Sequence, residues 1–196
     1  MITEAVRGNG AVLINKDGKR FFNELDTRDA VSAAILKQKD GVAYLFFDSD
    51  MQKSLKATNG YIKQSYCLNG ASLDEIAGKM GVDAATLKAT MEDWKKGKAA
   101  NKDAFGRADM PRNLDQGPFY AIMVTPAVHH TMGGLNTNVK AQCLDWTGTV
   151  IPRLYAAGEI TGGIHGTNRV GGNAVLDCFV FGQIAGENAA KEDVKA

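Results

Sequence analysis

Six glycines fall between Gly158 and Gly172, and they constrain this chain more than any other feature of its sequence. Glycine loses the most freedom on ordering and so weakens helices and strands, but it allows tight turns and close approach to a ligand. The segment therefore predicts a loop. A short apolar strand is predicted before it at residues 154–157, and the pattern of residues 173–190 predicts a helix after it.

The loop ends where this helix begins, at Gly171, Gly172, Asn173 and Ala174. Free backbone amides at a helix N-terminus carry partial positive charge and bind anions or polar oxygens. The pattern differs from the GxGxxG fingerprint of dinucleotide-binding folds. Two interpretations of the loop therefore stay open on these residues alone, a cofactor or anion site and a tight turn between a strand and a helix.

The first 130 residues predict an α+β body. Hydrophobic periodicity, an Asp17-Gly18 turn and capping residues such as Ser72 and Asp83 define its elements. Predicted strands cover residues 11–15, 20–23 and 42–47, and residues 118–126 are expected to be extended. Predicted helices cover residues 28–39, 51–55, 72–81 and 83–97. We expect one domain at residues 1–130 and a second at residues 131–196.

The composition excludes several classes of function. Hydrophobic residues make up 44% of the 196 residues, enough for a core, and the net charge of +1 gives no reason to expect nucleic acid or an anionic membrane as a partner. The sequence has no targeting peptide and no apolar run of the ~20 residues that span a membrane. The cysteines Cys67, Cys143 and Cys178 lack metal or haem spacing, so we predict buried thiols and no metal.

Four polar positions are candidates for chemistry. Arg28 falls in the first turn of a predicted helix, where a positive charge opposes the helix dipole and calls for a local partner. Glu4 and Arg7 are spaced to interact, and His129 precedes a second histidine in a loop. Each has a purely structural alternative, such as a surface ion pair of Arg28 with Asp26 or Asp29.

Taken together, these residues resemble the soluble, flavocytochrome-type fumarate reductases of the FAD-dependent fumarate reductase/succinate dehydrogenase flavoprotein family. The motifs follow in the family's order: TEAVRG at 3–8, GKRFFNE at 18–24, TRD at 27–29, HHTMGG at 129–134, LYAAGE at 154–159, HGTNR at 165–169 and GGNA at 171–174. The resemblance implies a capping, or clamp, domain at residues 1–130. Residues 131–196 would then be the C-terminal strand-loop-helix part of the FAD-binding domain, whose N-terminal dinucleotide-binding half is absent here.

The resemblance also implies site roles. Arg28 would be the general acid, with Glu4 and Arg7 as the relay that returns its proton. Thr3 would bind one carboxylate of fumarate. His129 and Arg169 would bind the other, which Arg169 could hold with two hydrogen bonds.

For the cofactor, the resemblance implies that Glu159 hydrogen-bonds the ribityl chain of FAD. The helix start at residues 171–174 would face the pyrimidine end of the flavin, where its dipole would stabilise the anionic reduced form. We expect FAD in the full-length protein and none on this chain alone, which would then be inactive. His165 also matches a family position, but no role follows for it.

Two alternatives to fumarate reduction stay open. The substrate could be another α,β-unsaturated acid such as urocanate, or the chain could be a capping-domain fragment without catalytic activity. The residues specify neither the electron donor nor a periplasmic or cytoplasmic location. We expect the glycine loop and the last helix to be mobile or to pack against another copy of the chain. The reason is the predicted apolar face of this helix, which consists of Val175, Leu176, Phe179 and Val180.

Overall fold

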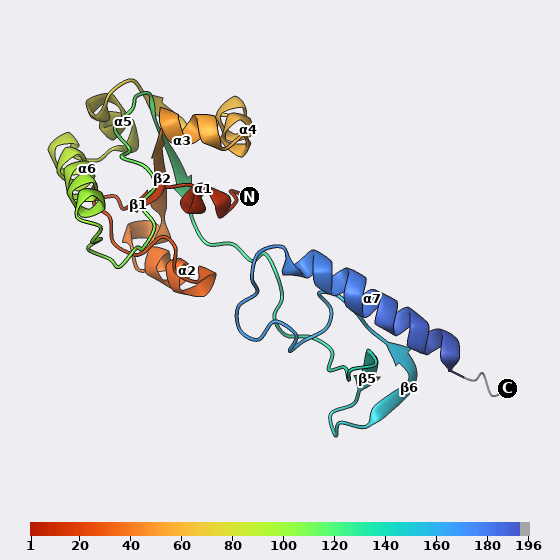
Figure 1. The fold of residues 1–196 in the computed structure, drawn as a ribbon. Helices are drawn as coiled ribbons and strands as arrows, with labels where there is room; N and C mark the ends of the chain where they lie inside the picture. The colour runs from red at the N-terminus through yellow and green to blue at the C-terminus, as the bar shows by residue number, and fades with distance from the viewer. Residues whose placement is uncertain (193–196) are drawn as a thin grey trace. The chain divides into compact units, whose positions relative to one another are not determined.

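The computed structural model describes residues 1–192, which fall into two compact units (Figure 1). Unit 1 comprises Met1–Pro126, and unit 2 begins at Ala127. The division thus lies close to the domain boundary expected at residue 130. Residues 193–196 of the expected second domain lie outside the described residues.

Unit 1 is built on a four-stranded antiparallel sheet with strand order β1-β2-β4-β3. Its strands are β1 (Val12–Ile14), β2 (Ala43–Asp48), β3 (Leu68–Gly70) and β4 (Phe119–Val124). The central strand β2 pairs with β4 along its whole length and is buried at every position. A strand buried on both faces reads as a continuous apolar run, which is how residues 42–47 appear in the sequence.

Helices cover both faces of this sheet (Figure 1). They are α1 (Ala5–Gly8), α2 (Arg28–Leu36), α3 (Ser49–Ser54), α4 (Ala57–Lys63), α5 (Leu73–Met80) and α6 (Ala84–Ala99), with a 3₁₀ turn at Lys39–Gly41. Successive side chains of a strand point to opposite faces. Tyr44 and Phe46 therefore pack with α5 and α6 in one hydrophobic cluster, whereas Leu45 and Phe47 pack with α1, α2 and α3 in another.

The capping residues act as predicted. Ser72 accepts a hydrogen bond from the Glu75 amide at 3.2 Å, and the Glu75 side chain accepts one from the Ala71 amide at 2.8 Å. Asp83 caps α6 in the same way, and Gly81 ends α5 with a φ of 70°. Local hydrogen bonds therefore fix where both helices begin.

Other local predictions fail. The predicted return strand at residues 20–23 is wrong, because only Arg20 bridges back to Ile14 before the chain turns to bury Glu24. The helix predicted over 28–39 ends at Leu36, and α1, α4 and β3 were not predicted. These three elements span only three to seven residues, too few to show a hydrophobic period.

Unit 2 consists of a β-hairpin, the glycine loop and one long helix. Its elements are β5 (Gln142–Leu144), β6 (Val150–Tyr155) and α7 (Asn173–Lys191). Asp145 shapes the hairpin turn, because its side chain accepts hydrogen bonds from the amides of Thr147 and Thr149 at 2.8 and 2.9 Å. The predicted loop and helix are confirmed, while the strand predicted at 154–157 begins earlier and ends at Tyr155.

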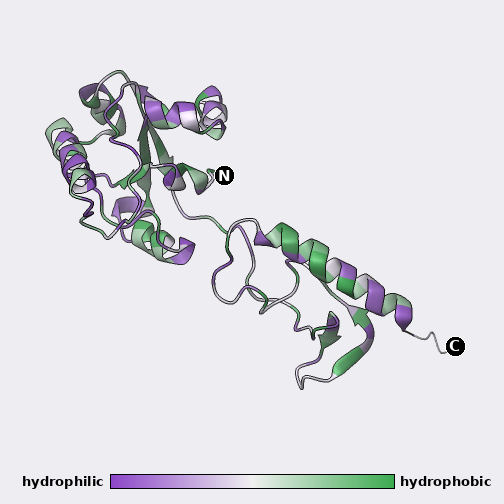
Figure 2. Ribbon diagram, viewed as in Figure 1, coloured by the Kyte–Doolittle hydropathy of each residue, from purple (hydrophilic) through white to green (hydrophobic). Residues whose placement is uncertain are grey.

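Figure 2 shows hydrophobic positions (green) along helix α7, with hydrophilic positions between them. Val175, Leu176, Phe179 and Val180 are all exposed within the described residues, Phe179 most of all at 75%. In residues 1–192, no helix is long and apolar enough to cross a membrane.

The three cysteines differ in burial. Cys143 is buried, and Cys67 is half-buried, where burial raises the pKa of its thiol to about 11. Cys178 is exposed on α7, so the expectation of a buried thiol is wrong at this position. It lies on a helix whose neighbouring apolar side chains are exposed as well.

Candidate functional site

Arg28 and Glu4 form a bidentate ion pair in unit 1. Arg28 donates from Nε to Oε2 and from Nη2 to Oε1 of Glu4, both at 2.5 Å. The pair is partly open to solvent, with side-chain exposures of 30% for Arg28 and 43% for Glu4. The hydrogen bonds that Arg28 donates to Glu4 raise the pKa of Arg28. Arg28 at the start of α2 thus pairs with Glu4, which lies 24 positions earlier in the sequence.

Arg7 lies beside this pair on α1. Burial lowers the pKa of Arg7, and the charge of Arg28 acts in the same direction, while the carboxylates of Glu4 and Glu24 oppose the change. Arg7 donates from Nη1 to the Glu24 carbonyl at 2.7 Å. The structure therefore brings together the three residues predicted as a general acid and its relay.

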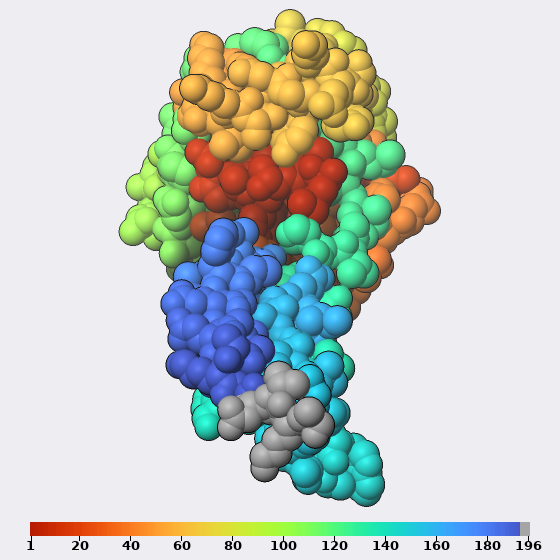
Figure 3. All heavy atoms as spheres, turned by 90° about the vertical axis from the view of Figure 1, so that its right-hand side faces the viewer, coloured from red at the N-terminus to blue at the C-terminus, as the bar shows by residue number. Residues whose placement is uncertain are grey.

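Thr3 begins the same segment. Its amide donates to the Tyr61 hydroxyl at 3.1 Å, and its own hydroxyl accepts a long hydrogen bond of 3.4 Å from the Ala5 amide. Figure 3 shows this N-terminal segment on the surface of unit 1, beside the region of α3 and α4. The Thr3 hydroxyl is thus only weakly engaged within unit 1.

Behind Arg7 lies a buried ionic cluster that our sequence analysis missed. Glu24 is completely buried and accepts two hydrogen bonds of 2.8 Å from Arg20. Arg20 also pairs with Asp103 at 2.5 Å and lies over the Trp94 ring, 4.7 Å from its centroid. A buried carboxylate needs such charged and hydrogen-bonding partners, because burying an isolated charge is costly.

Arg107 ties this cluster to α1. It donates to Glu24 Oε2 at 3.2 Å, to the Ala11 carbonyl at 2.9 Å and to the Arg7 carbonyl at 3.0 Å. The only sequence signal was the pair of charged residues Arg20 and Glu24 on either side of the apolar Phe21 and Phe22, since Asp103 and Arg107 lie in the stretch between residues 97 and 118 for which no element is predicted. The cluster holds the backbone that carries the predicted relay.

The histidine segment and Glu159 lie in unit 2. His129 is exposed, whereas His130 is nearly buried and places Nδ1 3.5 Å from Glu159 Oε2. The Thr131 amide donates to Glu159 Oε1 at 3.0 Å. This hydrogen bond and the nearby histidines lower the pKa of Glu159. Glu159 thus anchors the HHTMGG motif, a contact that the sequence analysis did not foresee.

The glycine loop places Arg169 and the start of α7. Arg169 is only 5% exposed and donates to the Val170 carbonyl at 3.2 Å. Gly172 is the N-cap of α7, with a φ of 88° that favours glycine, and no side chain caps this end. An added Cβ at Gly172 would meet nothing within 4 Å. The helix start at residues 171–174 therefore has no side-chain cap and borders open space at Gly172 within unit 2, while the Asn173 amide donates to the Val170 carbonyl at 3.3 Å.

His165 also acquires partners in unit 2. Its Nε2 lies 3.2 Å from Asp177 Oδ2 on α7, and its ring stands edge-on to that of His130 with 5.5 Å between the centroids. The side chain of His165 thus connects three segments of unit 2: residues 129–130, the glycine loop and α7.

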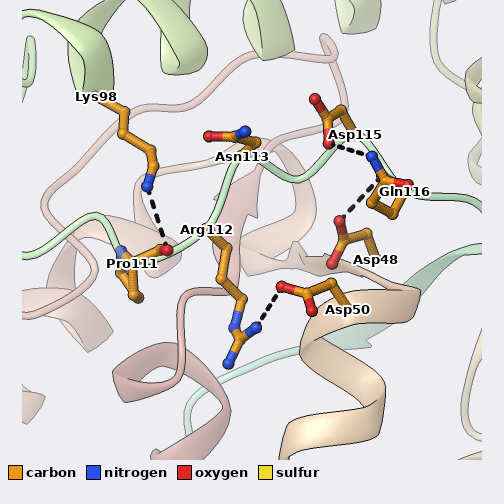
Figure 4. Close-up of a pocket in the computed structure, with 8 residues that line it drawn as sticks. All are labelled: Asp48, Asp50, Lys98, Pro111, Arg112, Asn113, Asp115 and Gln116. Carbon is orange, nitrogen blue, oxygen red and sulfur yellow. Dashed lines mark hydrogen bonds and ion pairs between the residues drawn. The ribbon is translucent and has the colours of Figure 1, made fainter.

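A polar pocket elsewhere in unit 1 contains none of the predicted site residues (Figure 4). Its acidic and arginine side chains already have partners within unit 1: Arg112 pairs with Asp50, Asp115 pairs with Lys95 outside the pocket, and Asp48 accepts from the amides of Met51 and Gln116. Within residues 1–192, no group of three His, Cys, Asp or Glu side chains is arranged to hold a metal ion.

Comparison with known proteins places the chain in a family. Residues 1–175 match the sequence model of a family described as FAD binding domain. The chain belongs to this family. Among curated members, a fumarate reductase (cytochrome) of Shewanella frigidimarina is 48% identical over 196 residues, which are 100% of this chain and 34% of that protein. The chain thus spans about a third of the length of that relative.

Two further matches bear on substrate and fold. A urocanate reductase of Eggerthella lenta is 40% identical over 93% of this chain and 31% of its own length. The open conformation of a flavocytochrome c3 fumarate reductase has a TM-score of 0.76 and 49% identity over 97% of this chain and 34% of that one. The mixed helix and sheet architecture of the family chain therefore matches a solved fumarate reductase.

Proposed function

We propose that this chain is part of an FAD-dependent oxidoreductase that reduces fumarate to succinate. The observation that carries the proposal is the bidentate Arg28–Glu4 pair with Arg7 beside it, on motifs that are shared in order with fumarate reductases. The 48% identity to the Shewanella fumarate reductase over all 196 residues supports the same reaction.

In this proposal, Arg169 and His129 bind one carboxylate of fumarate and Thr3 binds the other. Cationic and hydrogen-bonding groups suit a substrate that builds negative charge towards a carboxylate as the alkene is reduced. Arg169 lies in the glycine loop, is 5% exposed, and donates a hydrogen bond to the Val170 carbonyl at 3.2 Å. A guanidinium can hold a carboxylate with two parallel hydrogen bonds.

Arg28 donates the proton to the second alkene carbon. A guanidinium normally keeps its proton, and the Glu4 contact raises the Arg28 pKa further, so the transfer needs immediate replacement of the proton. The two Glu4 oxygens already contact Nε and Nη2, which provides a direct path for that replacement. Arg7, whose pKa is lowered by burial, resupplies Glu4.

The residues present also fit the flavin half of FAD. The uncapped start of α7 at residues 171–174 offers amides and a helix dipole suited to an anionic ring edge. Glu159 keeps 53% of its side chain exposed, so its carboxylate can accept a hydrogen bond from a ribityl hydroxyl in addition to its contacts with Thr131 and His130. When bound and reduced, FAD would supply the hydride. On this reading unit 1 is the capping domain and unit 2 is part of the FAD-binding domain.

A second candidate substrate is urocanate, favoured by the 40% identity to the Eggerthella lenta urocanate reductase. We favour fumarate because Thr3 and Arg169 together offer donors to both ends of a dicarboxylate. A ratio of kcat/KM between fumarate and urocanate decides between them.

The test uses two samples. The first is the purified chain, whose visible spectrum is recorded with and without FAD while fumarate-dependent oxidation of a reduced viologen dye is followed. The second is a chimera in which the chain replaces the 196 matching residues of the Shewanella fumarate reductase. We expect turnover in the chimera, and little flavin binding by the chain alone.

Arg28→Gln should lower kcat of the chimera by about 10²- to 10⁴-fold, the usual contribution of a general acid. Arg153→Gln, which changes an exposed arginine of β6, is the matched control and should leave the rate unchanged. A folded, flavin-loaded chimera without fumarate turnover would contradict the proposal, as would an active Arg28→Gln variant.

A further inference from the structure

His165 and Asp177 form a contact in unit 2 that the proposed reaction does not use. His165 lies in the glycine loop and Asp177 lies in the second turn of α7, and their Nε2 and Oδ2 atoms are 3.2 Å apart. Both side chains are shielded from water, with exposures of 13% for His165 and 3% for Asp177. Burying a carboxylate is costly unless it is hydrogen-bonded and paired with a charge.

Asp177 is unusual in a second respect. Its other oxygen, Oδ1, is buried and has no hydrogen-bond partner among residues 1–192. The hydrogen bond from His165 is therefore the contact within unit 2 that offsets the burial of this carboxylate. Since the carboxylate only accepts, it requires a proton on Nε2 of His165.

His165 also contacts the His130 ring. The His130 ring stands edge-on to the His165 ring, and His130 Nδ1 lies 3.5 Å from Glu159 Oε2. The four side chains thus run in the order Glu159, His130, His165 and Asp177. They connect the segment that contains His129, the loop that contains Arg169, and α7.

We propose that His165 and Asp177 are positioning residues for the substrate-binding groups of unit 2. Asp177 fixes the ring of His165 with its proton on Nε2, and this holds the loop onto α7, so that Arg169 keeps its place four residues further on. Through the ring contact with His130, the same pair steadies the neighbouring His129. The inference rests on the proposed function for the roles of Arg169 and His129, but the contact itself can be tested without it.

The first experiment follows the histidine side-chain nitrogens by ¹⁵N NMR in the 196-residue chain. We expect His165 to carry a proton on Nε2, and Asp177→Asn to remove this preference. The matched control is Glu187→Gln, the same carboxylate-to-amide change at an exposed position of α7, which should leave the His165 signals unchanged. A neutral His165 protonated on Nδ1 in the unaltered chain would overturn the inference.

The second experiment measures steady-state kinetics in the chimera described above. We expect Asp177→Asn and His165→Leu to raise the KM for fumarate about tenfold, the size of a lost hydrogen bond to a charged group, with a smaller change in kcat. His165→Gln retains an N–H donor and should recover much of the loss. An unchanged KM in a folded Asp177→Asn variant would sink the inference.

The two experiments separate this inference from the proposed function. If the chimera does not reduce fumarate, the proposed function fails, while the NMR result still decides whether Asp177 controls His165. If Asp177→Asn does not fold, the His165→Gln and His165→Leu pair decides, because equal KM values for these two variants would exclude a role for the N–H donor.

Discussion

The two units are stabilised in different ways. Unit 1 buries hydrophobic side chains on both faces of its sheet, in two separate clusters. The described part of unit 2 buries few side chains, and several of these are polar, namely Thr161, Arg169 and Asp177. Unit 2 also exposes the apolar side chains of α7. We infer that unit 1 has a core of its own, whereas unit 2 depends on a further surface to cover α7.

The predicted site residues follow the same contrast. Arg7 is mounted on a buried ionic cluster, in which Arg107 and Glu24 contact its backbone and side chain. Arg169 instead depends on a glycine loop that the His165–Asp177 contact fastens to α7. The residues proposed as the relay are therefore built into a unit with its own core, while Arg169, proposed to bind substrate, lies in a segment with few buried side chains around it.

Amide hydrogen exchange gives the largest expected contrast between the units. Amides of β2 and β4 should exchange at least about a thousandfold more slowly than those of α7 in a monomeric sample, because core strands open only with global unfolding. Mass-spectrometric or NMR exchange on the 196-residue chain measures this directly. Equal protection of α7 and β2 would show that unit 2 has a sufficient core.

A matched pair of phenylalanine truncations tests the same difference through stability. Phe47→Ala removes a completely buried ring and should lower the free energy of unfolding by about 3–5 kcal/mol. Phe179→Ala removes a ring that is 75% exposed and should change it by less than about 0.5 kcal/mol. Urea denaturation provides both values, and a large loss for Phe179→Ala would place α7 in a hidden interface, such as self-association.

The ionic cluster should matter more than a surface ion pair. Glu24→Gln removes the carboxylate that pairs with Arg107 and leaves Arg20 with Asp103 alone, and it should cost about 3 kcal/mol. Glu75→Gln disrupts the exposed pair with Lys79 and should cost less than about 1 kcal/mol. Similar values for the two variants in thermal or urea unfolding would show that the cluster is not a structural support.

Acid should destabilise unit 1 through Asp103. Burial alone would raise the pKa of this carboxyl, but the hydrogen bonds from Arg20 and from the amides of Arg107 and Phe105 outweigh it and lower the pKa. A lowered folded-state pKa contributes stability above the unfolded-state value of about 4, and this is lost as the pH falls through the folded-state value. Asp103→Asn should therefore flatten the acid side of the stability profile, and an unaltered profile would contradict this.

The local sequence determined the elements whose signals are themselves local. Patterns of two to twenty neighbouring residues predicted three kinds of element: the helix caps at Ser72 and Asp83, the buried strand at residues 42–47, and the helix after the glycine loop. The misfit of Arg28 at a helix start likewise predicted that it needs a partner. Family motifs supplied the proposed roles of Thr3, Glu4 and His129, and these roles stay predictions.

Only the tertiary structure decided which distant residues meet. Arg20 and Asp103 lie 83 positions apart, Arg28 and Glu4 lie 24 apart, and His165 and Asp177 lie 12 apart. No periodicity or capping rule links such positions, because those rules act between residues a few places apart along one element. The partners follow instead from how the elements pack, since a charge enclosed by that packing must find its counterpart there.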